Sequence, residues 1–394
     1  MKKKLIITLL ASSALTACFD SDDKTSSKFN PEKQTAIITN VDYTEGSQIA
    51  LAKVAQPRTI TDGFLSKTDS DYVVKTHGEH FYHIGRFGID TIQKYHIDAP
   101  SSGYYPNDGF VLRDAGDSTS SNPQDMAFIN DKTAIITFLG KTVAWVVNPE
   151  AKTFENFKIR ELDLSAYVFT KDGVPDLKNV EVINDRAFIS MQQYDTKAES
   201  DKEKQAYVAV FDINTWEEID ATPEDTNDTK AIALSIRNPQ GMQIVDGQIY
   251  LNGLGYGTKY VGGIEVINPK TLSNTVIYRA NAETGRISSL QMISKNKGFV
   301  TDYAAWQNNT FKMMNITSEG VTLTPIEGFE NTYLTTISKD GENNIWLGLG
   351  GEAATESKAE RQPGVQVFTS SGELSGDVLT TELNPASIVF LTKD

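Results

Sequence analysis

The feature that most constrains the fold of this chain is a repeat of about fifty residues that runs through most of its length. Each copy is a short apolar strand, a polar turn and a second strand that ends in small or aromatic residues. One apolar residue marks each unit, and successive markers are 45 to 60 residues apart: Val73, Met126, Val182, Met242, Met292, Ile337 and Ile388. A unit of this kind cannot bury both faces of its sheet alone, so the units must pack against one another.

The second half of each unit follows a pattern of its own. Residues 143–154, 207–219 and 262–274 each read as a strand, a turn rich in Asn or Asp, and another strand. Four strands in about fifty residues predict the blade of a β-propeller, an all-β fold. An array of two-sheet sandwiches is the alternative, but sandwiches do not repeat at this period.

The two ends of the repeat predict how the ring closes. Residues 384–391 resemble the first strand of a blade, and residues 35–40, 47–54 and 58–63 resemble strands that lack their first partner. Joining them gives seven blades and leaves no free sheet edge at the chain ends. A seven-bladed β-propeller closed by its N- and C-terminal strands should therefore place Ile388 beside Ile37 and Ile38.

The N-terminus has the form of a secretion signal. A charged start, MKKK, precedes an apolar stretch from Leu5 to Leu15 that is too short to span a bilayer as a mature helix. The sequence Leu-Thr-Ala before Cys18, the only cysteine, resembles a bacterial lipobox, which implies that Cys18 is acylated and becomes the new N-terminus. By the same resemblance, Phe19 after the cysteine implies the outer membrane. We expect a signal peptide at 1–17, a flexible tether at 18–33 and the propeller at 34–394.

The charge of the chain excludes some partners. The formal net charge is −15, and removal of residues 1–17 with their three lysines makes it −18. A body this acidic is poorly suited to bind nucleic acid or anionic lipid through nonspecific attraction. With one acylated cysteine no disulfide can form, so a buried core must supply the stability.

Two turn motifs carry a family resemblance. VVNPEAKT (146–153) and EVINPKTL (265–272) resemble turns of YncE-like seven-bladed propellers. The lipobox and the long interblade loops are also similar to those of surface propeller lipoproteins that serve TonB-dependent uptake. The resemblance implies an outer-membrane lipoprotein, periplasmic or surface-exposed, that captures a siderophore or another iron- or cofactor-bearing small molecule for a TonB-dependent receptor. An envelope protein-interaction scaffold and a propeller hydrolase or lactonase are the alternatives.

The expected ligand site lies in the loops that open onto one face of a propeller. These loops carry aromatic side chains for stacking and interleaved cations for charge-assisted hydrogen bonds, a combination suited to a planar, anionic or polyphenolic ligand. Tyr43 and Lys358 belong to the same loops. The predicted ligand-binding residues are Arg86, Phe87, Tyr104, Tyr105, Lys141, Tyr194, Tyr256, Lys259, Tyr260, Tyr303, Trp306 and Arg361.

All four histidines lie within one unit. His77, His80 and His83 have a spacing that resembles a string of metal ligands, and Glu79 and Asp98 are near enough in sequence to join them. In a strand, however, His80 and His83 point to opposite faces. The sequence therefore leaves two interpretations open: the histidines bind a metal ion, or they are structural residues whose nitrogen atoms form ordinary hydrogen bonds.

Catalysis has a weaker basis in the sequence. The chain contains no Gly-x-Ser-x-Gly elbow, phosphate loop or dinucleotide fingerprint. Propeller hydrolases and lactonases use carboxylates and histidines of the inner ring, and Asp125, Glu181 and Asp302 are the candidates for such positions here. Isolated acids at strand starts also cap turns, so both interpretations remain open.

Overall fold

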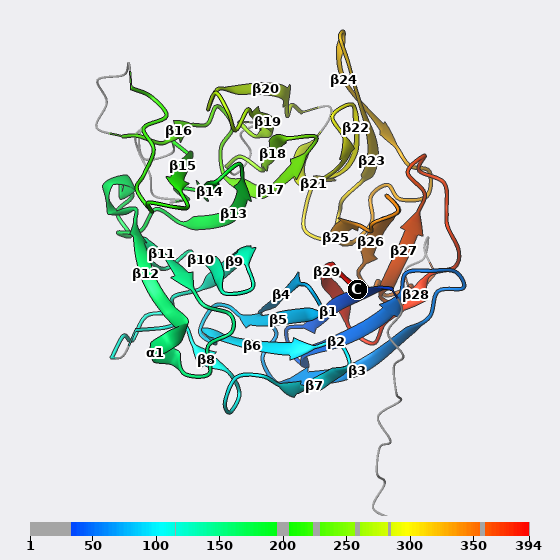
Figure 1. Cartoon of the computed structure of the whole chain (residues 1–394). Coiled ribbons are helices and arrows are strands. Elements are labelled where there is room, and N and C mark those ends of the chain that lie inside the picture. Colours follow the sequence, from blue (N-terminus) through cyan, green and yellow to red (C-terminus); the bar gives the residue numbers. More distant parts are fainter. Residues whose placement is uncertain are drawn as a thin grey trace, which may run out of the picture.

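The computed structural model describes residues 33–114, 116–194, 205–223, 229–256, 261–282, 285–354 and 359–393. Seven antiparallel sheets stand around a central axis, as Figure 1 shows. Six sheets have four strands and one has five. The chain is therefore a seven-bladed β-propeller, which confirms the prediction from the fifty-residue repeat.

Blade 1 is built from both ends of the chain. Its strands, from the axis outward, are β29 (Asn384–Thr392), β1 (Gln34–Asp42), β2 (Gly46–Lys53) and β3 (Ile60–Lys67). β29 pairs with β1 in an antiparallel register that sets Ile38 opposite Ile388. The predicted closure is confirmed, and the last strand is the innermost strand of the first blade.

The other blades follow in chain order, each from its inner to its outer strand. Blade 2 contains β4 (Tyr72–His77), β5 (His80–Gly85), β6 (Thr91–His96), β7 (Ala99–Gly103) and β8 (Phe110–Val111), which also pairs with β6. Blade 3 contains β9 (Pro123–Asn130), β10 (Thr133–Phe138), β11 (Val143–Val147) and β12 (Lys158–Asp163). Blade 4 contains β13 (Leu177–Ile183), β14 (Arg186–Met191), β15 (Tyr207–Asp212) and β16 (Ile232–Ala233).

Blades 5 to 7 complete the ring. Blade 5 contains β17 (Pro239–Val245), β18 (Gln248–Gly253), β19 (Gly263–Ile267) and β20 (Asn274–Arg279). Blade 6 contains β21 (Arg286–Ser294), β22 (Lys297–Tyr303), β23 (Phe311–Thr317) and β24 (Gly320–Pro325). Blade 7 contains β25 (Leu334–Lys339), β26 (Ile345–Leu349), β27 (Gly364–Phe368) and β28 (Leu379–Thr380). A short helix α1 (Phe154–Phe157) and a 3₁₀ turn η1 (Ser165–Tyr167) flank β12.

The hydrophobic core lies between neighbouring blades. Alternate apolar residues of each strand point to opposite faces of its sheet, so every sheet packs on both sides. At the closure, Ile38 and Ile388 pack with fully buried Trp346 of blade 7. The Trp346 indole N–H donates to Asp340 Oδ2 at 3.0 Å, which satisfies the polar atom of this buried ring.

The antiparallel order of the blades determines which connections share a face. The loop between the second and third strands of a blade lies at the same end as the connection from its outer strand to the next blade. We call this end of the propeller the loop face; it includes residues 41–46, 86–90, 139–142 and 304–310. Among the described residues, no helix has the length and apolar character needed to cross a membrane.

Candidate functional site

A pocket of about 450 Å³ opens on the loop face where blades 6, 7 and 1 meet. Its floor comes from the first residues of the inner strands β21, β25 and β29, and its walls come from loops 41–43 and 301–309. We call this cavity the aromatic pocket. Its volume lies within the range of small-molecule sites in proteins.

Four aromatic side chains line the aromatic pocket. Tyr43 and Trp306 stand at the rim, where they are 78 % and 65 % exposed. Tyr303 and Tyr333 line the wall, and the Tyr333 ring centroid is 6.3 Å from that of Trp306. Large aromatic rings left open to solvent around a cavity favour stacking on a ring-shaped ligand.

The polar lining of the aromatic pocket is almost entirely uncharged. The lining residues that the structure describes include no Lys or Arg, and the one carboxylate, Asp42, accepts hydrogen bonds from the Thr44 backbone and hydroxyl. The Thr335 hydroxyl is buried, and none of the described residues forms a hydrogen bond with it. An unsatisfied buried hydroxyl costs stability unless a ligand or water completes it. The uncharged polar groups of the lining are Ser288, Ser289, Thr301, Gln307, Asn309, Thr335 and Asn384.

Tyr333 is held in the wall from two sides. Its ring lies over Gly350, where an added Cβ would stand 2.0 Å from the Tyr333 Cδ1 atom. The Arg361 guanidinium donates to the backbone carbonyls of Tyr333 at 3.1 Å and of Gly350 at 2.8 Å. Arg361 also pairs with Glu352 at 3.0 Å. The predicted ligand residue Arg361 therefore braces the pocket wall with its charge already compensated.

The other described cations of the predicted set are also paired. Arg86 Nε donates to Asp71 Oδ1 at 2.8 Å, and Lys141 Nζ lies 2.6 Å from Asp114 Oδ2. The structure therefore does not support the predicted mixture of free cations and aromatic rings at one mouth. The aromatic part of the prediction, at Tyr303 and Trp306, lies together in the aromatic pocket.

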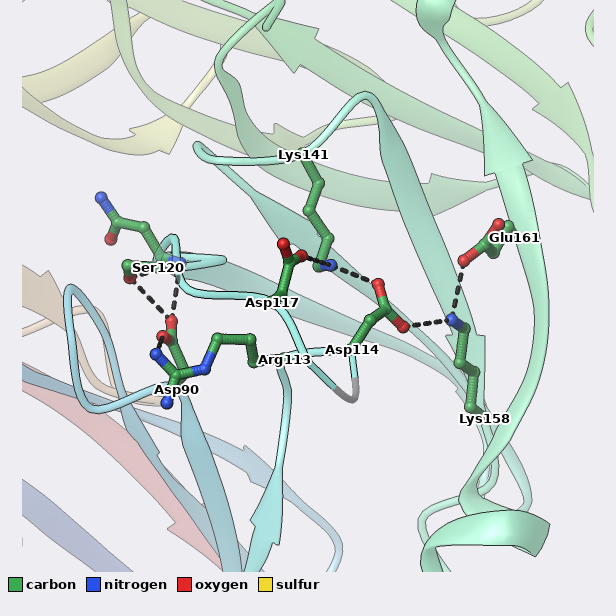
Figure 2. A network of polar contacts seen from close by, with 9 residues as sticks. Asp90, Arg113, Asp114, Asp117, Ser120, Lys141, Lys158 and Glu161 are labelled. Atoms are coloured by element: carbon green, nitrogen blue, oxygen red, sulfur yellow. Dashed lines mark hydrogen bonds and ion pairs between the residues drawn. The ribbon is translucent and has the colours of Figure 1, made fainter.

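The Lys141 side chain points toward the connection between blades 2 and 3, where its carboxylate partner Asp114 lies (Figure 2). Figure 2 shows two carboxylates that anchor this connection from both sides. Asp114 receives Lys141 and also Lys158, at 3.0 Å, while buried Asp90 accepts the Ser120 hydroxyl at 2.9 Å. The Lys141 side chain is only 8 % exposed, so the lysine ties the connection to blade 3.

Other predicted aromatic residues occupy different parts of the loop face. Tyr194 and Tyr256 stack across blades 4 and 5 with ring centroids 5.3 Å apart, and the Tyr256 hydroxyl donates to the Gln193 carbonyl at 2.6 Å. Phe87 on blade 2 is 69 % exposed. The structure does not place these three rings in the lining of the aromatic pocket.

The structure places Tyr104 and Tyr105, predicted for the ligand mouth, against blade 3 and outside the lining of the aromatic pocket. Tyr105 is 2 % exposed in the core between blades 2 and 3, and its hydroxyl donates to the Pro149 carbonyl at 3.0 Å. The Tyr104 hydroxyl donates to Glu150 Oε2 at 2.9 Å. The reason is that this segment first forms β7 and β8 along blade 2 before it returns to the axis.

The structure does not bring the three candidate metal-binding histidines together. His77 stacks on Phe128 and contacts Asp131 at 2.9 Å, whereas His83 is buried against the Tyr72 ring. The His80 ring packs edge-on against the His96 ring. His96 lies 3.4 Å from the carboxylate of Glu79 and 4.0 Å from that of Asp98, the two acids that were candidates to join the metal ligands. Burial lowers the pKa of His83 to about 3 and, with nearby Lys94, that of His80 to about 4. Within the described residues no group of three His, Cys, Asp or Glu side chains is placed to hold a metal ion.

Four residues of the predicted set lie outside the described part of the chain. They are the lipidation candidate Cys18 and the loop residues Lys259, Tyr260 and Lys358.

Two of the three candidate catalytic carboxylates lie near one another on inner strands. Asp125 of β9 forms an ion pair with Lys75 of β4 and accepts the Val180 amide at 3.1 Å. Burial, and next the charge of Asp125, raise the pKa of Glu181 to about 7, while Lys75 opposes the rise. Asp302 is elsewhere, on blade 6, where it pairs with Lys312 at 2.5 Å.

Some residues that complete these sites carry no clear signal in the sequence. Tyr333 and Asn384 line the aromatic pocket, and Lys178 and Gln124 meet on inner strands of blades 3 and 4. All four residues lie at or next to the loop-face ends of inner strands, namely β25, β29, β9 and β13. A search restricted to the long loops does not include these strand ends.

Comparison with known proteins supports the fold and leaves the ligand open. No family model matches the chain, and no curated protein matches it. A solved protein from Lactobacillus plantarum has a TM-score of 0.60 at 12 % identity, over 92 % of this chain and all of that one. A "putative 6-phosphogluconolactonase" from Bacteroides fragilis has a TM-score of 0.57 at 11 % identity, over 92 % of this chain and 100 % of its own. AztD from Citrobacter koseri has a TM-score of 0.51 at 9 % identity, over 92 % of this chain and 99 % of its own. At these identities the similarity shows the shared propeller fold.

Proposed function

We propose that this chain is a lipid-anchored propeller that captures a small molecule in the aromatic pocket. The observation that carries the proposal is the pocket of about 450 Å³ with Tyr43 and Trp306 exposed at its rim. Anchoring through Cys18 and an outer-membrane location are supported by the signal-like N-terminus. Delivery of a siderophore or another iron- or cofactor-bearing molecule to a TonB-dependent receptor is supported by resemblance to surface propeller lipoproteins.

The lining defines the part of the ligand that enters the pocket. Four aromatic rings and a set of hydroxyl and amide groups favour a flat, conjugated body with uncharged hydrogen-bonding groups. The cations of the predicted set that the structure describes already have carboxylate partners, so they supply no free charge for an anionic ligand. We therefore expect an aryl-bearing iron chelate or a corrinoid to enter by its ring face.

Binding to the soluble mature chain tests the proposal. The mature chain with Cys18→Ser is titrated with a ferric catecholate, haem and a corrinoid while tryptophan fluorescence is recorded. Trp306 is the most exposed indole of the chain, whereas Trp145 and Trp346 are fully buried, so quenching reports on the pocket rim. Saturable quenching by a ring-bearing ligand is the expected result.

A matched pair of variants locates the binding site. Tyr43 and Phe87 are exposed aromatic residues on the same loop face, but only Tyr43 lines the aromatic pocket. Tyr43→Ala should weaken calorimetric binding about tenfold, because one stacking ring is lost, while Phe87→Ala should leave it unchanged. If none of the ligands binds, or if both variants bind as tightly as the unsubstituted chain, the proposal fails.

A propeller hydrolase is a second candidate, and Glu181 is the observation that favours it. A carboxyl group with a pKa near 7 beside Asp125 and Lys75 suits proton transfer at neutral pH. In lactone hydrolysis, water adds to the ester carbonyl and the ring oxygen leaves as a protonated hydroxyl. Turnover of a simple lactone that is lost in Glu181→Gln supports this candidate, and turnover unchanged in that variant contradicts it.

A further inference from the structure

A second group of polar side chains lies on blades 2 to 4, away from the aromatic pocket. Lys178 Nζ on β13 donates to Gln124 Oε1 on β9 at 2.6 Å. The same oxygen lies 3.5 Å from Arg86 Nη1, in the loop after β5. The Gln124 amide nitrogen donates to Asn122 Oδ1 at 2.7 Å, which keeps the carbonyl oxygen turned toward the two cations. Two cationic groups therefore converge on one neutral acceptor.

The two cations of this group differ in their partners. Arg86 pairs with Asp71, but Lys178 has no carboxylate within ion-pair distance among the described residues. Asp125, whose charge acts on Lys178, is already engaged by Lys75 and by the Val180 amide. Buried charges are normally paired, so a half-buried ammonium with only an amide acceptor lacks one negative charge.

The acid–base properties of Lys178 agree with this geometry. Burial, and next the positive charge of Arg86, lower the pKa of Lys178 to about 8, while the charges of Asp125 and Asp71 oppose the fall. A lysine bonded to one amide oxygen keeps two N–H donors for another partner, and Arg86 Nη1 also has donor capacity. An anion placed beside these donors would receive charge-assisted hydrogen bonds and offset the cost of the buried ammonium.

We propose that Lys178, with Arg86 and Gln124, binds an oxyanion, the carboxylate or phosphate group of a ligand. No carboxylate among the described residues bonds Lys178 directly, so a small anionic group can take that place. It lies on blades 2 to 4, whereas the aromatic pocket lies on blades 6, 7 and 1. The oxyanion site is therefore independent of ligand capture in the aromatic pocket.

Thermal unfolding of the mature Cys18→Ser chain tests the oxyanion site. Acetate and inorganic phosphate are each compared with chloride at equal ionic strength and neutral pH. Binding to the folded state should raise the Tm by on the order of 2 °C at tens of millimolar oxyanion. Stabilisation by acetate alone assigns the site to carboxylates, stabilisation by phosphate alone assigns it to phosphates, and either result supports the proposal.

Three variants separate this site from general salt effects. Lys178→Met should abolish the oxyanion-dependent rise in Tm, while Lys132→Met, at an exposed lysine on blade 3, should retain it. Gln124→Glu supplies a carboxylate of its own, so it should also abolish the rise and return the pKa of Lys178 toward its usual value. That pKa is measured by NMR of ¹³C-labelled lysine side chains, which keeps the test valid if Lys178→Met unfolds. The absence of oxyanion stabilisation, or equal stabilisation of the unsubstituted chain and the Lys178 and Gln124 variants, overturns the proposal.

Discussion

Two parts of the propeller use the same blade architecture for different chemistry. Where blades 6, 7 and 1 meet, the ends of the inner strands carry aromatic rings, hydroxyls and amides around an open pocket. On blades 2 to 4, equivalent inner strands carry ionisable groups: Lys75 pairs with Asp125, Lys178 donates to Gln124, and Glu181 is close enough to Asp125 to be affected by its charge. The fold therefore determines where on the propeller a ligand can bind, and the side chains at the strand ends determine which kind of ligand binds there.

The difference also has a cost in stability. The rings of the aromatic pocket can remain exposed without a large penalty, because a few exposed apolar groups are normal on a protein surface. Ionisable groups on the inner strands of blades 2 to 4 must be paired or must change their pKa. Substitutions on blades 2 to 4 should therefore affect stability more than substitutions at the pocket rim.

The largest effect is expected at Asp125. Asp125→Ala removes the partner of Lys75 and the acceptor of the Val180 amide. The free energy of unfolding should fall by about 3 kcal/mol, at the lower end for a buried pair because the Lys75 side chain is 34 % exposed. Urea denaturation measures the loss. Asp131→Ala, at an 83 % exposed carboxylate, is the control and should change little. Equal losses in both variants would show that burial of the Asp125 carboxylate adds nothing to its effect on stability.

Glu181 should make stability depend on pH. Its pKa is raised to about 7 by burial and by Asp125, so the folded state binds the proton more tightly than the unfolded chain. The protein should therefore lose stability as pH rises from about 4.5 to about 7, by on the order of 2 kcal/mol. Glu181→Gln should remove this dependence and gain stability relative to the unsubstituted chain as pH rises. Urea denaturation midpoints of the two proteins, measured from pH 4.5 to 7, test this prediction. A constant difference between the two midpoints across that range would contradict it.

The structure shows how far the sequence could predict these features. Ring closure was predictable because Ile38 and Ile388 belong to strands whose missing partners complete each other, and the register confirms it. The pairing of Lys178 with Gln124 was not, because the two residues lie 54 positions apart on different blades. Tyr105 was misplaced because the sequence pattern does not distinguish a loop from a segment that first follows the outer part of a blade. The sequence repeat is enough to predict the propeller scaffold, whereas side-chain contacts between different blades can be identified only from the three-dimensional structure.

A smaller effect is expected behind the pocket wall. In Gly350→Ala the new methyl group would overlap the Tyr333 ring, which must move toward the pocket. Affinity for a ring-bearing ligand should fall about tenfold, while the free energy of unfolding changes by only about 1 kcal/mol. Calorimetric titration and urea denaturation of the same sample measure both. Gly173→Ala, away from the pocket, meets no atom at the added Cβ but strains a backbone with φ +84°, so it should lower stability and leave affinity unchanged. An unchanged affinity in Gly350→Ala would contradict the described wall.

The smallest effect is expected at Thr335. Its hydroxyl is buried in the pocket lining and has no partner in the part of the chain that the structure describes. Thr335→Val should therefore leave stability unchanged or raise it by up to about 1 kcal/mol. If a ligand completes this hydroxyl, the same variant should bind it several-fold more weakly. Thermal unfolding with and without ligand measures both effects. A marked loss of stability in the ligand-free variant would show that the hydroxyl already has a partner.

The most direct test of the contrast is one calorimetric series with a ring-bearing ligand that carries no carboxylate or phosphate, such as a corrinoid without its nucleotide loop. The series compares the unsubstituted mature chain with Trp306→Ala and Lys178→Met. Saturable binding that Trp306→Ala weakens at least about tenfold, and that Lys178→Met leaves within about twofold, is the predicted result. Binding that depends on Lys178 and tolerates the loss of Trp306, or no binding at all, would contradict it.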